Sequence, residues 1–390
     1  MKAIVVLALL GTAAIAQTTV PMILEGNVPI VELRFDTPSG GARTARFVVD
    51  SGGGGFILGS KLTADIGAKA QGPVREEDGE KFQPLMGVHA RAGEMELDLS
   101  GTLTSGLVGQ DRMLARNDAE GMIPGRLLER YRMIFDYPGR TLTFAKPSGA
   151  EGRGVKLPSG IRPNNGFPRI EIQIGGATYG VLLDTGASFT MISRVALEQW
   201  SKAHADWPSA IGAFGFANMG GGKMEAEAMM LRIPEMKLGS IVVRGPAAVS
   251  RQEGTFERSM SRRMTAPIIG SVAGNVLRDF RVEIDYQNRF VYLEKGKDAP
   301  STEISGVGLV LGPGKNGLTV SAVASSAAAD VKANVHAGDE LIAIDKFEMA
   351  GKPLAFAAEA LQGPPGSPRR LTLLRNGERV NVTVSCARLL

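Results

Sequence analysis

Short stretches of the chain alternate apolar and polar residues, which is the pattern of half-buried β-strands. In residues 29–50 an alternating stretch is followed by a turn and by an apolar run, and the run leads into Asp50-Ser51-Gly52. Residues 168–186 repeat this order and end in Asp184-Thr185-Gly186. We therefore expect two related units, each with a buried strand that leads into an acidic turn.

The two units also end alike. Residues 125–144 and residues 274–293 each predict a glycine turn, a short helical piece, a strand, a hairpin turn and a final strand. An Asp-Ser/Thr-Gly tripeptide is common in ordinary turns. Because both copies follow an apolar run at the same place in a repeated unit, two unrelated turns are a poor explanation of them.

Two breaks in the pattern divide the chain. Residues 147–168 are rich in Gly, Pro and Ser, and a second break lies near residues 295–305. Beyond it we expect a domain that folds separately, with strands over 306–311 and 318–323, a turn and strand over 335–345, a short helix over 353–361 and a hairpin over 371–384. The expected domains are residues 17–150, 151–298 and 303–390.

Composition agrees with a mainly β fold. Hydrophobic residues make up 44% of the chain, which allows a sizeable core, whereas aromatic residues make up 6%. The 50 glycines suit many short strands joined by tight turns better than long helices. A net charge of +4 is too small, and too evenly spread, to indicate a nucleic-acid partner or binding to a membrane surface.

The N-terminus has the features of a secretory signal. Lys2 is followed by an apolar run, and Ala14-Ile15-Ala16 fits a cleavage site before Gln17. The run is too short for a membrane anchor, which needs about 20 apolar residues, and no later segment is long and apolar enough to cross a bilayer. The lone Cys386 excludes an intrachain disulfide and a thiolate metal cluster. We expect residues 1–16 to be the signal peptide of a secreted or periplasmic bacterial protein.

The two acidic turns suggest hydrolysis. One carboxylate can take a proton from water, while a neighbouring carboxylic acid polarises the scissile carbonyl. Two carboxyls held close together share a proton, because both cannot ionise at once. We expect Ser51 and Thr185 to bond to the backbone of the opposite turn, and Gly52 and Gly186 to let the two turns approach closely.

These turns resemble the active-site loops of aspartic proteases of the pepsin and retropepsin type. The resemblance is carried by residues 47–52 and 181–188 and extends over residues 25–296. It implies two β-barrel lobes with a cleft between them, and Asp50 and Asp184 as the catalytic pair. It also implies a supporting role for the hydroxyl of Ser188.

In this family an apolar-apolar-Gly segment packs behind each acidic turn. Ile123-Pro124-Gly125 fits this role in the first lobe. In the second lobe, either Ile268-Ile269-Gly270 or Val272-Ala273-Gly274 fits it.

Two features depart from the family pattern. Many members have a hydroxyl residue directly after the first acidic turn, where this chain has Gly53, Gly54 and Gly55. The flap of the first lobe, expected about Glu80 to Glu96, lacks the tyrosine of pepsin-like enzymes. The glycine run supports an alternative, in which the chain is a non-catalytic peptide-binding protein with a degenerate protease fold.

The last domain resembles the PDZ domains of bacterial proteases. The resemblance is carried by residues 306–309, 323–328 and 336–344 and by Gly377. It implies a groove between residues 307–311 and the helix near 354–361, in which an extended peptide, often a protein C-terminus, binds as an added strand. The residues expected at this groove are Gly306, Val307, Gly308 and Leu309.

Other chemistries have little support. His89, His204 and His336 are the three histidines, and they are isolated, so neither a metal cluster nor a histidine-based triad is indicated. The glycine run lacks the Gly-Lys-Ser/Thr ending of a phosphate loop. We expect a monomeric aspartic endopeptidase that cleaves extended polypeptides through activated water. It should need no metal or organic cofactor, and its PDZ domain should assist substrate binding.

Overall fold

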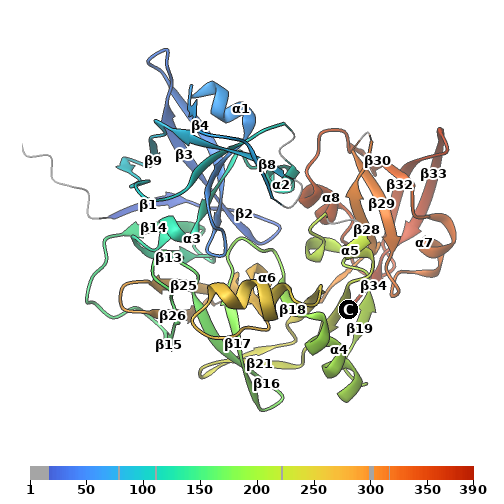
Figure 1. Cartoon of the computed structure of the whole chain (residues 1–390). Helices are drawn as coiled ribbons and strands as arrows, with labels where there is room; N and C mark the ends of the chain where they lie inside the picture. The colour runs from blue at the N-terminus through green and yellow to red at the C-terminus, as the bar shows by residue number, and fades with distance from the viewer. Residues whose placement is uncertain (1–16, 78–79, 110–111, 221–222, 298–302, 316) are drawn as a thin grey trace, which may run out of the picture.

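The computed structural model describes residues 17–77, 80–109, 112–220, 223–297, 303–315 and 317–390. Strands dominate the chain, which confirms the predicted mainly β fold. Figure 1 shows lobe 1 (residues 17–150) in blue to teal, lobe 2 (residues 151–297) in green through yellow to light orange, and a C-terminal unit (residues 303–390) in deeper orange and red. The predicted signal peptide lies outside the described residues. Within the described part of the chain, no helix is long and apolar enough to span a membrane.

Lobe 1 is built on a mixed sheet with the strand order β10-β9-β3-β4-β12-β5-β11-β8-β6, in which β2 pairs with β3 and β7 with β8. Its strands are β2 (Ile23–Glu25), β3 (Val28–Asp36), β4 (Ala42–Asp50), β5 (Phe56–Leu58), β6 (Lys69–Ala70), β7 (Arg75–Glu77), β8 (Glu80–Met86), β9 (Ala90–Ala92), β10 (Met95–Glu96), β11 (Thr104–Leu107) and β12 (Gly121–Pro124). Its helices are α1 (Ser60–Asp65), α2 (Arg112–Ala115) and α3 (Gly125–Leu128). Inside the lobe, Phe47 stacks between Phe35 and Phe56 at centroid distances of 5.5 and 5.3 Å.

Lobe 2 repeats the centre of this arrangement in a sheet with the order β19-β20-β23-β18-β24-β17-β16-β21-β22. Its strands are β16 (Arg169–Ile174), β17 (Ala177–Leu183), β18 (Thr190–Ser193), β19 (Ser209–Ile211), β20 (Met229–Arg232), β21 (Glu235–Leu238), β22 (Ile241–Arg244), β23 (Ala247–Arg251) and β24 (Gly270–Val272). Its helical segments are α4 (Arg194–Ala203), η1 (Gly215–Ala217), α5 (Lys223–Ala226), η2 (Thr255–Met260), η3 (Ser261–Arg263) and α6 (Gly274–Leu277). Strand β24 runs parallel to β17 as β12 runs parallel to β4, so the predicted repeat is present in the fold.

The two lobes share a further sheet, with the order β1-β14-β13-β25-β26-β15. Its strands are β1 (Gln17–Pro21), β13 (Arg132–Asp136), β14 (Thr141–Ala145), β15 (Val155–Pro158), β25 (Phe280–Asp285) and β26 (Phe290–Lys295). The predicted ending of each unit contributes here, since β13 of lobe 1 pairs antiparallel with β25 of lobe 2. The register places Arg132 opposite Asp285 and Asp136 opposite Arg281, so the two endings meet in a symmetric way.

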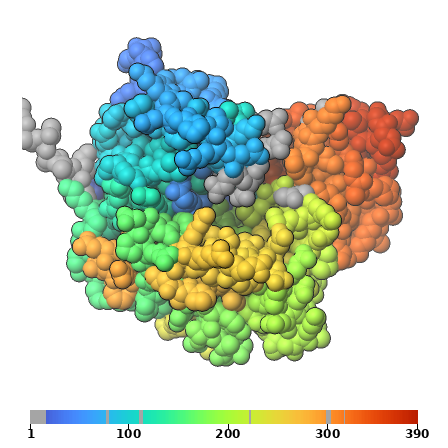
Figure 2. Space-filling model, viewed as in Figure 1, coloured from blue at the N-terminus to red at the C-terminus, as the bar shows by residue number. Residues whose placement is uncertain are grey.

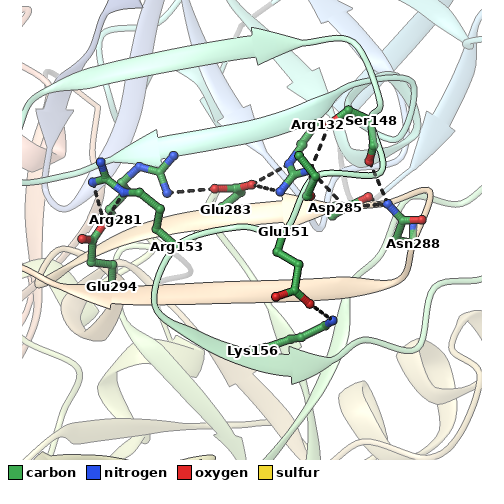
Figure 3. Close-up of polar contacts among 11 residues, drawn as sticks. Arg132, Ser148, Glu151, Arg153, Lys156, Arg281, Glu283, Asp285, Asn288 and Glu294 are labelled. Atoms are coloured by element: carbon green, nitrogen blue, oxygen red, sulfur yellow. Dashed lines mark hydrogen bonds and ion pairs between the residues drawn. The ribbon is translucent and has the colours of Figure 1, made fainter.

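A buried ion network fixes this shared sheet (Figure 3). Arg132 forms an ion pair with Glu283, and its Nη1 lies 3.5 Å from Oδ2 of Asp285; these side chains are 6%, 3% and 1% exposed. Arg281 donates a second hydrogen bond to Glu283 at 2.8 Å, and Asn288 donates one to Asp285 at 2.8 Å. Because a buried charge without a partner is costly, the network sets the register of lobe 1 against lobe 2.

The C-terminal unit has its own sheet, with the order β28-β29-β30-β32-β33 and with β31 paired to β30. Its elements are β27 (Ser305–Gly306), β28 (Leu309–Pro313), β29 (Leu318–Val323), α7 (Ala329–Asn334), β30 (Glu340–Ile344), β31 (Phe347–Glu348), α8 (Leu354–Ala360), β32 (Pro368–Arg375), β33 (Glu378–Ser385) and β34 (Ala387–Arg388). The strand predicted over 306–311 is interrupted at Val307 and Gly308, because Gly308 has a φ of 79° and leaves the strand conformation. Strand β28 therefore begins at Leu309.

The C-terminal unit and lobe 2 share one hydrophobic core. Phe214 and Ala217 of lobe 2 belong to the same buried cluster as Leu309, Leu311 and Leu361 of the C-terminal unit. Burial of these apolar side chains joins the two parts in the folded chain. Separate folding of the C-terminal domain stays a prediction.

Hydrogen bonds reinforce this contact. The side-chain amide of Asn218 is 2% exposed, and it donates to the backbone oxygen of Leu311 at 2.8 Å. The backbone nitrogen of Ser325 donates to the oxygen of Ile211 at 2.9 Å, and the nitrogen of Ile211 donates to the Ser325 hydroxyl at 2.8 Å. The C-terminal unit is thus held firmly on lobe 2.

Candidate active site

The two acidic turns lie at the ends of equivalent buried strands. Strand β4 ends at Asp50, and β17 ends one residue before Asp184. Val49 and Leu183, which precede the two acids, are fully buried. The apolar side chains anchor each turn, so the position of each carboxyl is set by the core of its lobe.

Four hydrogen bonds join the two turns reciprocally. The hydroxyl of Ser51 donates to the oxygen of Leu183 at 2.6 Å, and the hydroxyl of Thr185 donates to the oxygen of Val49 at 2.7 Å. Each hydroxyl also accepts from the backbone nitrogen of the other turn, at 3.0 Å in both directions. Ser51 and Thr185 are fully buried, so these bonds form away from water and lock one turn against the other.

The glycines of the turns bring each backbone against the opposite carboxyl. A Cβ atom at position 186 would lie 2.2 Å from Cγ of Asp50, and one at position 52 would lie 3.3 Å from Oδ1 of Asp184. No other residue type leaves this space free. The structure therefore brings Asp50, Gly52, Asp184 and Gly186 into one site.

Both carboxyls are held so that ionisation is difficult. Burial raises the pKa of Asp50 to about 6, and burial together with the negative charge of Asp50 raises the pKa of Asp184 to about 8. The backbone nitrogens of Gly52 and Gly186 oppose this by donating to the carboxyls at 2.8 and 3.1 Å. At neutral pH the pair therefore holds about one proton.

The glycine run after the first turn has a steric reason. A Cβ atom at position 53 would lie 2.9 Å from Oδ2 of Asp50 and 3.1 Å from Cε of Met122. A hydroxyl residue at this position, as many aspartic proteases have, would therefore have to displace one of these side chains. The departure from the family pattern fits the packing of Met122 beside the carboxyl.

Behind each turn lies an apolar-apolar-Gly segment. The nitrogen of Gly125 donates to the oxygen of Gly53 at 3.1 Å, and the nitrogen of Gly274 donates to the oxygen of Ala187 at 3.0 Å. These equivalent bonds identify residues 272–274, at the end of β24, as the counterpart of residues 123–125. Of the two candidates left open by the sequence, this one has the matching contact.

Ser188 and Arg116 join the lobes beside the acidic turns. The Ser188 hydroxyl accepts from Nη2 of Arg116 at 2.9 Å, and Arg116 also donates to the oxygen of Phe216 at 3.3 Å. Burial lowers the pKa of Arg116 to about 10, and its positive charge in turn lowers the pKa of Asp184. The sequence analysis missed Arg116, because it lies in an irregular loop of lobe 1 with no motif around it.

Two tyrosines that follow the strands of the shared sheet were also missed. Tyr137 and Tyr286 are 1% and 5% exposed. Burial raises the pKa of both hydroxyls, with a further contribution from Asp184 for Tyr137 and from Glu129 and then Asp50 for Tyr286. The sequence feature that could have identified both tyrosines is an Asp-Tyr dipeptide, which occurs in the ending of each repeated unit.

The hairpin over the site is formed by β7 and β8, which together span residues 75–86 apart from its tip. The predicted flap, about Glu80 to Glu96, was wrong in its second half, because β9 and β10 lie at the other edge of the sheet, beside β3. Phe82 of β8 lines a cavity of about 1150 Å³, together with Gly54 and Met122 from the neighbourhood of Asp50. The cavity thus adjoins Gly54, which follows the first acidic turn, and Met122, which packs beside Asp50.

The residues predicted to bind a peptide in the C-terminal unit lie against lobe 2. Gly306, Val307, Gly308 and Leu309 line a cavity of about 460 Å³ that lobe 2 closes on one side with residues that include Phe214, Phe216 and Asn218. Val307 is fully buried and Leu309 is 3% exposed. Any peptide bound there would contact lobe 2 as well as the C-terminal unit.

Parts of the chain are similar to known proteins. Residues 170–271, which include the turn at Asp184, match the aspartyl protease family. The carboxy-terminal-processing protease of Bartonella bacilliformis is 30% identical over 126 residues, or 31% of this chain. The chain spans 29% of that relative's length. The aspartic proteinase from Irpex lacteus matches 74% of this chain and 99% of its own structure, at 13% identity and a TM-score of 0.43. The family match thus falls on lobe 2.

Proposed function

We propose that the protein is an aspartic endopeptidase in which Asp50 and Asp184 activate water against a peptide carbonyl. The observation that supports this most is the pair of buried acidic turns, one from each lobe, joined by four reciprocal hydrogen bonds. Burying two carboxyls side by side opposes their ionisation and costs stability. Perturbed groups of this kind concentrate at sites where they have a chemical task.

The reaction uses the single proton of the pair. The ionised carboxyl takes a proton from water, and the water oxygen forms a bond to the carbonyl carbon. The protonated carboxyl donates to the carbonyl oxygen, which stabilises the negative charge that develops there. The tetrahedral intermediate then breaks its C–N bond, and the leaving nitrogen takes a proton from the pair. The pair returns to its singly protonated state.

The substrate is an extended polypeptide that lies in the cleft beneath the hairpin of β7 and β8. Both acids come from one chain, so the enzyme acts as a monomer. Residues 1–16 direct its export, and it works as a secreted or periplasmic protein after cleavage near Ala16. The C-terminal unit, residues 303–390, has a PDZ-type fold and assists the binding of substrate.

Inhibitor classes test this proposal. The mature chain should cleave an unfolded protein mixture, and a hydroxyl-containing transition-state mimic such as pepstatin should block the cleavage. Chelators, thiol reagents and serine reagents should leave the rate unchanged. Binding of polypeptide without any cleavage would instead favour the non-catalytic peptide-binding protein.

A further inference from the structure

The C-terminal unit borders the same cavity as Gly54 and Gly55, which follow the acidic turn of lobe 1. The cavity of about 1150 Å³ has Gly54, Phe82 and Pro84 of lobe 1 on one side and Lys352 and Leu354 of the C-terminal unit on another. Figure 2 shows lobe 1 in blue and the C-terminal unit in orange side by side along one edge of lobe 2. A polypeptide in the cleft would therefore also contact the C-terminal unit, which follows the two lobes in the sequence.

This wall is fixed to both lobes. The nitrogen of Ala355, at the start of α8, donates to the oxygen of Arg116 in lobe 1 at 3.1 Å. The side chain of Asn218 in lobe 2 donates to Leu311 at 2.8 Å. Since Arg116 itself bonds to Ser188 beside the second acidic turn, the loop before α8 has a fixed position relative to the site. A fixed wall can discriminate between side chains of a bound substrate.

The charges along this cavity favour an acidic ligand. Its lining includes the cations Arg75, Arg116, Arg263 and Lys352 and the anions Glu76, Glu80 and Asp118. Asp118 is already paired with Arg46 at 2.6 Å. Among the side chains that the structure describes, no carboxylate forms an ion pair with Arg263 or Lys352. The ammonium of Lys352 is exposed and lies 5.0 Å from the ring centroid of Phe356.

We propose that the C-terminal unit forms one wall of the substrate cleft, and that Lys352 on this wall selects polypeptides with an acidic side chain at a fixed distance from the cleaved bond. This proposal rests on the proposed protease activity. It assigns to the C-terminal unit a specificity role that depends on the loop before α8 and not on the groove near Gly306.

Cleavage-site profiling of a peptide library with the full mature chain tests the proposal. We expect Asp and Glu to be enriched at one position relative to the cleaved bond. Lys352→Glu should reduce this enrichment about threefold, the scale of an exposed ion pair. The matched control is Lys346→Glu, which changes another exposed lysine of the same unit that lies over an aromatic ring, 5.2 Å from the Phe347 centroid, but outside the cavity. The control should keep the profile of the unmodified chain.

A profile without acidic preference, or an equal change in both variants, would overturn the proposal. Binding of a fluorescein-labelled Glu-containing decapeptide, followed by anisotropy in the Asp184→Asn background, separates this proposal from the proposed activity. Weaker binding in the Lys352→Glu variant alone supports the recognition of an acidic side chain by Lys352. This holds even if the unmodified chain cleaves nothing, because a lack of cleavage would contradict only the proposed protease activity. Equal binding in both lysine variants would contradict recognition by Lys352.

Discussion

At the scale of single residues, position 186 has room only for a hydrogen atom. A Cβ there would lie 2.2 Å from Cγ of Asp50, so Gly186→Ala must displace either the turn or the carboxyl. A shift of about 1 Å in a reacting group can cost about 100-fold in rate, and we expect a loss of that size in peptide hydrolysis. Gly149→Ala is the control, because no atom lies within 4 Å of its Cβ position. Equal activity of the two variants would contradict the described packing of the turns.

The pH dependence of the rate is also decided by single residues. Burial raises the pKa of Asp50 to about 6, and burial with the charge of Asp50 raises the pKa of Asp184 to about 8. Below the lower pKa the pair gains a second proton and loses its base, while above the higher pKa it loses the proton that polarises the carbonyl. We therefore predict a bell-shaped profile of kcat/KM with its maximum between these two values. A rate that still increases at pH 3 would contradict this environment of the pair.

At the scale of elements, the pairing of β13 with β25 depends on a buried charge. Arg132→Met removes one of the two cationic partners of Glu283 and the ion-pair partner of Asp285, which are 3% and 1% exposed, and should lower the free energy of unfolding by about 3–5 kcal/mol. Arg153→Met is the matched control in the same region (Figure 3), because Arg153 is 67% exposed in its pair with Glu294. Its effect should stay below about 1 kcal/mol. Urea unfolding measures both, and equal effects would show that the network does not hold the shared sheet.

Elements with local patterns were predictable, and elements placed by distant contacts were not. Alternating apolar and polar residues identified β3 and β16, which have one buried side. Continuous apolar runs identified the ends of β4 and β17, which are buried on both sides. The flap was placed too far along the chain, because the alternating residues near 90–96 pair with β3 at the opposite edge of the sheet. Arg116 could not be found, since its partner Ser188 is 72 residues away and no local pattern reports that contact.

At the scale of the whole molecule, the C-terminal unit packs on lobe 2 and borders the cavity of about 1150 Å³. Truncation after Lys297 would expose Phe214 and Ala217, which are 1% and 0% exposed, and would remove the bond from Ala355 to Arg116. If the C-terminal domain folded separately, as the sequence predicts, its removal would leave the cleavage of short peptides unchanged and would slow only that of long polypeptides. The shared core changes that expectation, and we predict that the truncated chain loses stability and cleaves both substrates more slowly. The ratio of the two rates checks this, and an unchanged rate on short peptides would restore the separable domain.

In the proposed mechanism the two lobes contribute one essential carboxyl each. Its most direct test is kcat/KM for one peptide substrate in the unmodified chain, in Asp50→Asn and in Asp184→Asn, with folding checked by circular dichroism. Asparagine keeps the shape of the side chain but cannot share a proton, so each variant should lose at least about 100-fold in rate while it remains folded. Activity within about tenfold of the unmodified chain in either folded variant would contradict the paired-carboxyl mechanism.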